Sequence, residues 1–258
     1  MVRQTRGKTK PNRHSLWLTW FAEQYNQREP FSDRSIIDLG YGEKPYSVLE
    51  LHEASRGFDS PPSIIGVESA NHRHQQALAE GHPEISFILD ENVDFSRYRP
   101  PPKLIRALNV LRQYPPHEVA AIRRGWLSTS PGDVLLTEGT TDRDGDTLAM
   151  WCQSHEAPST LVFGVTGRRG FAPDQLRAVL PNDLRWLHPK PMWLERLFED
   201  WTLAWATTDS TKDPLDRFTR SVERLSARHP AWIRTAPAFW VRGLVEFCVD
   251  DIVADISR

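Results

Sequence analysis

The sequence is poor in cysteine, in long apolar runs and in net charge. Cys152 and Cys248 are the only cysteines among 258 residues and form no CxxC pair, which argues against a disulfide scaffold and a cysteine zinc site. No run approaches the roughly 18 apolar residues of a membrane span, and the N-terminus lacks the apolar core of a secretory signal. The formal net charge of -2 does not favour a nucleic acid or a membrane as partner. We expect a cytoplasmic protein without membrane association.

Metal-binding patterns are also weak. His72 and His74 stand two residues apart on an expected helix, where their side chains point to nearly opposite sides. The segment DRDGD at 142–146 has the alternating acids of a calcium loop, but Thr147 replaces the glycine that should follow and Gln153 the closing glutamate. A polar turn explains this segment by ordinary turn chemistry. We therefore expect no metal site.

The first thirteen residues, MVRQTRGKTKPNR, carry five basic residues, no acid and almost nothing apolar. Such a segment buries too little surface to fold alone, so we predict a basic flexible arm over 1–13. Two roles stay open for it. The arm would bind the phosphates of RNA or DNA by counterion release, or Arg13 and its neighbours would fold over a ligand crevice as a lid.

From residue 35 onward, short β-rich runs alternate with helical segments. Strands are expected at 35–39, 63–68, 85–89, 103–110, 133–139, 147–153 and 159–167. Helices are expected at 45–57, 69–81 and 115–129, and an amphipathic helix, SLWLTWFAEQY, precedes the first strand. The alternation predicts an α/β fold, Rossmann-like and doubly wound, with a mostly parallel sheet of seven strands.

Beyond residue 190, apolar residues recur at helical spacing. The longest such series is Trp193, Leu197, Trp201 and Trp205, followed by Leu215, Phe218, Val222 and Leu225, and by Val241, Leu244, Cys248 and Ile252. We predict a helical C-terminal extension over 191–258, packed on a main domain that spans 14–190. Its tryptophans either fill the core between the helices and the sheet or line a ligand pocket.

The loop after the first expected strand, in SIIDLGYGEKP, carries the strongest signal of function. Ligands of open parallel sheets bind at the carboxyl ends of the strands, which this loop borders. A dinucleotide requires G-x-G-x-x-G, but Pro45 occupies the third position after Gly40 and Gly42. Asp38 and Glu43 would repel a pyrophosphate, and no P-loop motif occurs. The loop therefore favours a cofactor that lacks phosphate and carries positive charge.

Four segments together resemble the successive motifs of class I S-adenosylmethionine-dependent methyltransferases. They are IIDLGYGEKP, IIGVE, ALNVLRQYP and LSTSPGDVLLTEG, within roughly residues 35–140. The combination of PNR, DLGYG, NVLRQY and EGT is also similar to a bacterial branch of that family with no assigned substrate. The resemblance implies S-adenosylmethionine as the cofactor, whose ammonium and sulfonium suit a loop flanked by carboxylates.

The resemblance also implies roles for the residues at the strand ends. The backbone of Gly40, Tyr41 and Gly42 would approach the amino-acid part of the cofactor, with Asp38 near its ammonium. Glu68, at the end of the second strand, would accept hydrogen bonds from the ribose hydroxyls.

Two further residues belong to the same implied site. Asp90, after the third strand, would reach the adenine amino group, with Glu91 and Asp94 as alternatives because the register is ambiguous. Asn109, at the end of the fourth strand, would lie beside the transferred methyl group.

The segment NVLRQYPP differs from the N-P-P-Y motif of enzymes that methylate amino groups of nucleic acids. It is more similar to the same segment of small-molecule methyltransferases, which implies methyl transfer to a small molecule by in-line displacement. Tyr114 and His117 are the candidate general bases, although a base is optional for this chemistry. The alternatives are an RNA or DNA methyltransferase that uses the basic arm, or a cofactor-binding protein without transferase activity. The acceptor and the oligomeric state stay open.

Overall fold

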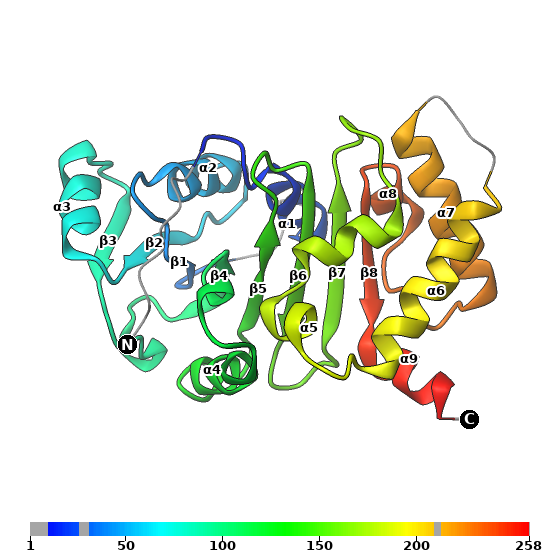
Figure 1. The fold of residues 1–258 in the computed structure, drawn as a ribbon. Coiled ribbons are helices and arrows are strands. Elements are labelled where there is room, and N and C mark those ends of the chain that lie inside the picture. Colours follow the sequence, from blue (N-terminus) through cyan, green and yellow to red (C-terminus); the bar gives the residue numbers. More distant parts are fainter. Residues whose placement is uncertain (1–9, 26–30, 209–212, 258) are drawn as a thin grey trace.

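A central sheet of eight strands organises the chain, and helices cover both of its faces (Figure 1). The computed structural model describes residues 10–25, 31–208 and 213–257. The strands are β1 Ser35–Leu39, β2 Ser63–Glu68, β3 Ile85–Leu89, β4 Pro102–Leu108, β5 Leu135–Thr141, β6 Thr147–Gln153, β7 Thr160–Val165 and β8 Leu244–Cys248. The α-helices are α1 Ser15–Tyr25, α2 Tyr46–Ser55, α3 Asn71–Glu80, α4 Pro116–Ser128, α5 Asn182–Trp186, α6 Met192–Ala206, α7 Pro214–Arg228, α8 Pro237–Trp240 and α9 Val249–Ile256. Within these described ranges, three short 3₁₀ helices join them: η1 Phe95–Arg97, η2 Leu111–Gln113 and η3 Pro173–Val179.

The strands follow the order β3-β2-β1-β4-β5-β6-β7-β8. The chain runs from β1 through α2 to β2 and through α3 to β3, then returns past β1 to begin β4 on its other side. The pairs from β3 to β5 are parallel, whereas β6, β7 and β8 form antiparallel pairs with their neighbours. The predicted α/β fold with a doubly wound, mostly parallel sheet is confirmed.

The prediction of seven strands was wrong, because the sheet has eight. The extra strand, β8, lies within the C-terminal segment for which we predicted only helices, at the place where Leu244 and Cys248 fit a helical period. These two positions belong to LVEFC, a short apolar run that suits a buried strand as well as a helix. Pairing with β7 decided between the two, since this run covers the open edge of the sheet and α9 follows it directly.

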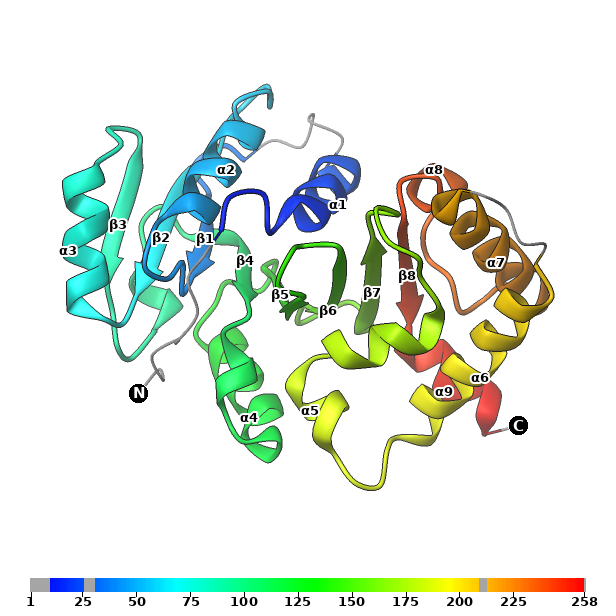
Figure 2. The ribbon, with the colours of Figure 1, turned by 45° about the horizontal axis from the view of Figure 1, so that its top comes forward.

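Alternate residues of the strands point to opposite faces of the sheet and separate the core into layers. Ile36 and Ile64 pack with α1, α2 and α3 on one face, whereas Ile37 and Ile65 pack with residues of α4 on the other. Figure 2 shows α1, α2 and α3 on one side of the sheet and α4, α5 and α6 on the other. The predicted amphipathic helix is therefore α1, which buries its apolar side against the sheet.

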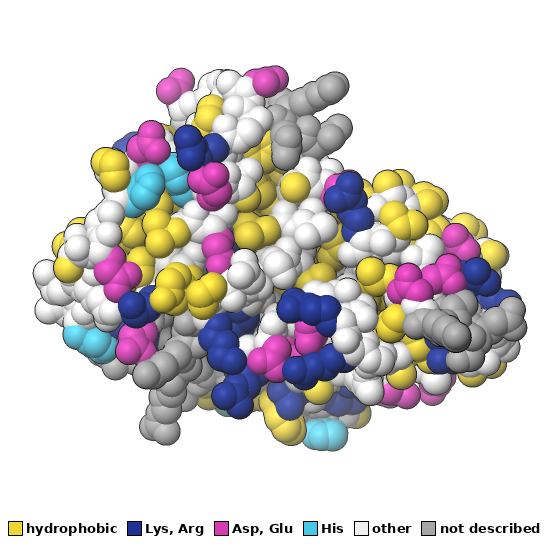
Figure 3. All heavy atoms as spheres, turned by 90° about the horizontal axis from the view of Figure 1, so that it is seen from above, with side chains coloured by type: hydrophobic (Ala, Val, Ile, Leu, Met, Phe, Trp, Pro, Cys, Tyr) yellow, Lys and Arg dark blue, Asp and Glu magenta, His cyan; other side chains and the backbone are white. Residues whose placement is uncertain are grey.

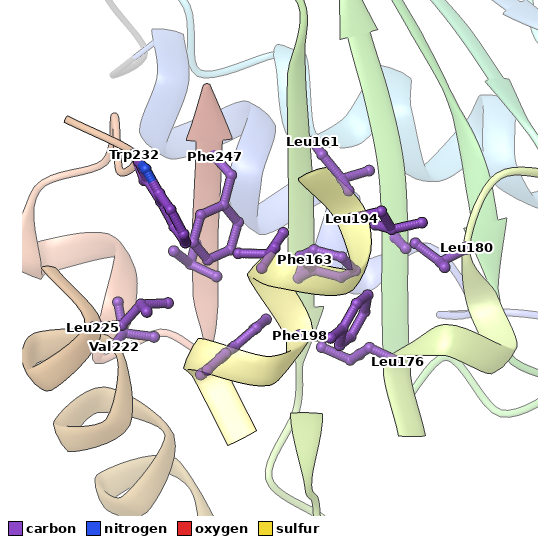
Figure 4. Close-up of a cluster of buried hydrophobic side chains, with 14 of the residues drawn as sticks. Leu161, Phe163, Leu176, Leu180, Leu194, Phe198, Val222, Leu225, Trp232 and Phe247 are labelled. Carbon is purple, nitrogen blue, oxygen red and sulfur yellow. The ribbon is translucent and has the colours of Figure 1, made fainter. Parts of the chain in front are cut away.

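The C-terminal helices bury aromatic side chains against β7 and β8. In Figure 4, Phe198 of α6 points towards Phe163 of β7, with 5.7 Å between their ring centroids, and Trp232 lies beside Phe247 of β8. Trp201 and Trp232 are at most 1% exposed. These tryptophans fill the core between the helices and the sheet, which was the first of the two roles that the sequence left open. Among the described residues, no helix combines the length and the apolar character required to cross a membrane.

Candidate functional site

The loops after β1 and β4 meet at the carboxyl edge of the parallel strands. The backbone N–H of Gly40 donates to the carbonyl of Val67 at 2.7 Å, and that of Asn109 donates to the carbonyl of Gly139 at 2.7 Å. Gly40 has φ +74°, and a Cβ atom there would lie 2.9 Å from a methyl group of Val110. Glycine is required at this position both by the backbone conformation and by the close approach of the second loop.

Glu68 is the last residue of β2 and contacts the glycine loop. Its carboxylate accepts a hydrogen bond from the backbone N–H of Gly42 at 3.0 Å and others from Ser69 and Ala70 at 2.9 and 3.2 Å. The guanidinium of Arg73, from α3, lies 3.6 Å from the same carboxylate. Glu68 is 3% exposed, so it is a buried acid held by backbone amides and a nearby cation. This contact fixes the loop relative to β2.

Asp38, at the end of β1, lies beneath the loop in a buried ion pair. Both of its oxygens face the guanidinium of Arg106, at 2.9 Å from Nε and 2.8 Å from Nη2, and the Ser47 hydroxyl donates to it at 2.6 Å. Arg106 is 0% exposed and lies over the ring of Trp17 at 4.6 Å. The same guanidinium donates to the carbonyl of Ser47 at 2.7 Å. The pair of Asp38 and Arg106 thus connects β1 and β4 to the start of α2 and to helix α1.

Tyr41 turns its side chain away from the loop and into the core. Its ring is 1% exposed and meets Phe87 of β3 edge-on, with 5.5 Å between the ring centroids. A Cβ atom on Gly66 would lie 3.1 Å from this ring, so the small residue in β2 leaves room for it. Tyr41 therefore offers its backbone to the loop, while its side chain anchors the loop to β2 and β3.

Asp90 is the acid that directly follows β3. It accepts hydrogen bonds from the hydroxyl of Tyr98 and from the backbone N–H of Asn92, both at 2.9 Å. Burial and this bond to Asp90 raise the pKa of Tyr98. Asp94 instead begins η1 by accepting from Ser96, whose hydroxyl lowers the pKa of Asp94, and Glu91 is exposed. The three acids therefore occupy different environments, and Asp90 is held at the end of the strand.

Asn109 links the ends of β4 and β5 to the residues before α1. It adopts φ +62°, and its amide donates to the Thr141 hydroxyl at 3.1 Å while accepting from the Thr141 backbone N–H at 3.3 Å. The amide nitrogen also lies 3.5 Å from Nε2 of His14. Thr141 and His14 were not among the site residues predicted from the sequence. Neither belongs to a motif, and only the fold brings residue 14 to the end of β5.

The described part of the basic arm packs against the turn between β5 and β6. Arg13 donates to the carbonyls of Asp142 and Thr141 at 3.0 and 3.3 Å, and Lys10 lies 3.4 Å from a carboxylate oxygen of Asp144. Gly145 has φ +75°, and a Cβ atom there would lie 2.6 Å from the carbonyl oxygen of Arg13. Figure 3 shows Lys and Arg side chains gathered around acidic ones on part of the upper face. Residues 1–9 of the predicted arm lie outside the described residues.

The two candidate bases lie in different surroundings. Tyr114 is 8% exposed within the core that α4 covers, and its carbonyl accepts a hydrogen bond from the side chain of Asn182 at 2.6 Å. His117 stands in the first turn of α4 with 79% of its side chain exposed, 3.8 Å from Glu118. The side chain of Tyr114 is therefore buried under α4, whereas that of His117 is mostly exposed to solvent.

A cavity of about 310 Å³ lies at the same edge of the sheet, beside the turn between β5 and β6. Its walls come from this turn, from the end of β7 and from η3, and include Asp142, Thr147, Thr166, Arg169, Phe171 and Gln175. Asp142 directly follows Thr141, which is bonded to Asn109. One wall of the cavity is therefore formed by the residue that follows Thr141 in the chain.

The burial of His14 predicts a loss of stability in mild acid. Burial lowers the pKa of His14 to about 3, and the positive charges of Arg106 and Arg13 contribute. The folded state therefore keeps His14 neutral, while the unfolded chain takes up a proton below about pH 6.5. We expect this residue to reduce the free energy of unfolding by about 2 kcal/mol between pH 7 and pH 5.

Urea denaturation at both pH values measures this effect. In His14→Asn, the difference in the free energy of unfolding between pH 7 and pH 5 should become smaller by that amount. His117→Asn, at an exposed position, is the matched control and should show the same difference as the wild type. An unchanged difference in His14→Asn would show that another group causes the acid sensitivity.

The fold and this edge define an α/β protein with a glycine loop next to two buried acids, Asp38 and Glu68. No protein-family model and no curated protein matches the sequence. Among solved structures, the chain is similar to the plantazolicin methyltransferase BamL with a desmethyl analogue and SAH (18% identity, TM-score 0.37, 51% of this chain and 47% of that one). It is also similar to LepI with SAM (16%, 0.38, 52% and 33%) and to magnesium protoporphyrin IX methyltransferase of Synechocystis PCC 6803 with SAH (15%, 0.36, 52% and 62%). The chain thus spans less than two thirds of each.

Proposed function

We propose that this protein binds S-adenosylmethionine at the carboxyl edge of its sheet and transfers the methyl group to a small molecule. The observation that carries the proposal is a row of acids at the carboxyl edge of three neighbouring strands: Asp38 lies near the end of β1, Glu68 ends β2 and Asp90 directly follows β3. A ligand with two positive groups and several hydroxyl and amino donors suits such a row of acids, whereas a phosphate does not. The sequence motifs of residues 35–140 support the same cofactor.

Each residue of the edge has a proposed part in cofactor binding. The turn at Gly40 and Gly42 brings backbone groups to the amino-acid part of the cofactor. Glu68 accepts from the ribose hydroxyls, and Asp90 accepts from the adenine amino group. Asp38 lies near the ammonium, where it shares its negative charge between the cofactor and the guanidinium that it already holds.

Methyl transfer from a sulfonium is an in-line displacement, in which the acceptor lone pair forms the new bond to carbon as the carbon–sulfur bond breaks. The protein contributes mainly by holding donor and acceptor in line. Asn109 stands at the centre of the edge and bonds to Thr141. We place the acceptor in the cavity that begins at the next residue, Asp142, between the β5–β6 turn and Phe171. We assign no general base, since Tyr114 lies in the core under α4 and His117 is exposed.

The described part of the arm supports a small molecule over a nucleic acid as acceptor. Lys10 and Arg13 are two of its five basic residues, and both contact the β5–β6 turn of their own chain. Charges held in this way are less available to phosphates. Their position at the edge of the site agrees with the lid role considered for Arg13.

Calorimetric titration with S-adenosylmethionine and with its demethylated product tests the proposal. We expect binding with a dissociation constant of about 1–100 μM, and Gly42→Asp should weaken it at least tenfold. Gly42 has φ +86° and bonds to Glu68, so a new carboxylate there is both strained and repelled. Gly132→Asp is the matched control, because a Cβ atom at Gly132 meets no atom within 4 Å.

Binding of neither ligand by the wild-type chain at millimolar concentration would refute the proposal. If both ligands bind, a panel of small acceptors incubated with radiolabelled methyl donor separates a transferase from a protein that only binds the cofactor. Release of labelled product would exclude the latter.

A further inference from the structure

A second cluster of polar side chains lies between helix α2 and the turn that precedes β3. His52 belongs to the second half of α2, whereas His82 and Glu84 form the turn between α3 and β3. One ligand atom from each of the three side chains lies within 4.8 Å of the others. We propose that these three residues bind a divalent transition metal of the Zn²⁺ type. The proposal is independent of the cofactor and of methyl transfer.

The geometry of the cluster is close to that of a metal site. Nε2 of His52 lies 3.2 Å from Oε2 of Glu84, and the two imidazole rings are 4.5 Å apart between centroids, with their planes at 58°. Two ligands of a tetrahedral zinc ion, each about 2.1 Å from the metal, stand about 3.4 Å from each other. One pair of ligands therefore already has this spacing, and small side-chain rotations would bring the third into place.

The donor set favours zinc over the hard cations. Two imidazoles and one carboxylate form a common three-residue zinc site with a fourth position left for water, whereas Mg²⁺ and Ca²⁺ select oxygen ligands. The side chain of His52 is only 12% exposed, while that of Glu84 is 68% exposed. One ligand is thus held firmly by packing, and the open side near Glu84 gives the metal a route from solvent.

The metal would tie together two elements that border the cofactor site. Helix α2 begins directly after the glycine loop, and β3 ends directly before Asp90. Joining the far end of α2 to the start of β3 would restrict the movement of both. The alternative is a simple ion pair in which a proton on His52 takes the place of the metal.

Equilibrium dialysis of the untagged full chain against ZnCl₂ tests the site directly. We expect one zinc per chain at micromolar free metal, and thermal denaturation should show a rise in Tm of about 5 °C at a hundredfold excess over the dissociation constant. The double variant His52→Gln, His82→Gln should lose at least tenfold in affinity together with the rise in Tm. Glu84→Gln should lose affinity as well.

The matched control is the double variant His72→Gln, His117→Gln, which removes two histidines at exposed positions. It should retain both zinc and the rise in Tm. The proposal is overturned if the wild-type chain retains no zinc, or if the His52 and His82 variant retains as much as the control. Circular dichroism at 25 °C confirms that each variant is folded before the metal content is compared.

Discussion

Arg106→Met is expected to lower the free energy of unfolding by about 3–5 kcal/mol, the loss typical when one partner of a buried ion pair is removed. Asp38 is 3% exposed and faces the guanidinium with both oxygens, so among the described residues the variant leaves this buried carboxylate with the Ser47 hydroxyl as its remaining side-chain donor. The ring of Trp17 also loses its stacked cation. Urea denaturation at pH 7 measures the loss.

Two further variants separate the charge from the packing. The double variant Asp38→Asn, Arg106→Met removes both charges and should recover part of the stability. Arg56→Met is the control for removing an arginine, because Arg56 and its partner Glu53 are 65% and 73% exposed and their pair contributes at most about 1 kcal/mol. A loss below 1 kcal/mol in Arg106→Met would contradict a structural role of the buried pair.

Glu68→Ala is expected to weaken the binding of S-adenosylmethionine by about 100-fold, which corresponds to about 2.7 kcal/mol. This estimate rests on the proposed function. The substitution removes the acceptor for the ribose hydroxyls and also the carboxylate that holds the N–H of Gly42. Titration calorimetry measures the affinity, and denaturation measures the stability of the same variant.

Glu156→Gln is the matched control, since Glu156 is an exposed acid in the turn between β6 and β7. It should bind the cofactor within about twofold of the wild type. Glu68→Gln keeps one oxygen acceptor for the backbone amides and should bind with intermediate affinity. If Glu68→Ala binds as well as the wild type while remaining folded, Glu68 has no part in cofactor recognition.

The strands and helices of the first half follow closely from local sequence. SIIDL and SIIGVE are short apolar runs bounded by turn residues, and the structure begins and ends β1 and β2 at the expected residues. Helix α3 ends before Gly81, whose N–H donates to the carbonyl of Ala77 at 3.1 Å. In this region, the local preference and the tertiary packing agree, because strands that join the sheet alternate along the chain with helices that cover it.

The sequence was less informative where two local structures fit one pattern. The apolar positions of LVEFC satisfy both a helix and a strand, and only the exposed edge of β7 decides in favour of β8. The cluster of His52, His82 and Glu84 was missed for a related reason. His72 and His74 stand close together in the sequence and were therefore the pair considered as metal ligands. One strand and one helix separate His52 from His82, so only the fold brings these two together.

The sequence by itself determined the order of strands and helices from β1 to β7, the position of the glycine loop and the acids that end the parallel strands, because periodicity, turn residues and chain order are local properties. Only the tertiary structure decided what those acids contact. Asp38 pairs with Arg106 on a neighbouring strand, Glu68 turns onto Gly42, and Asn109 meets His14. These partners are brought together by strand order and helix packing, since the energy of a buried charge depends on neighbours that lie far away in the chain.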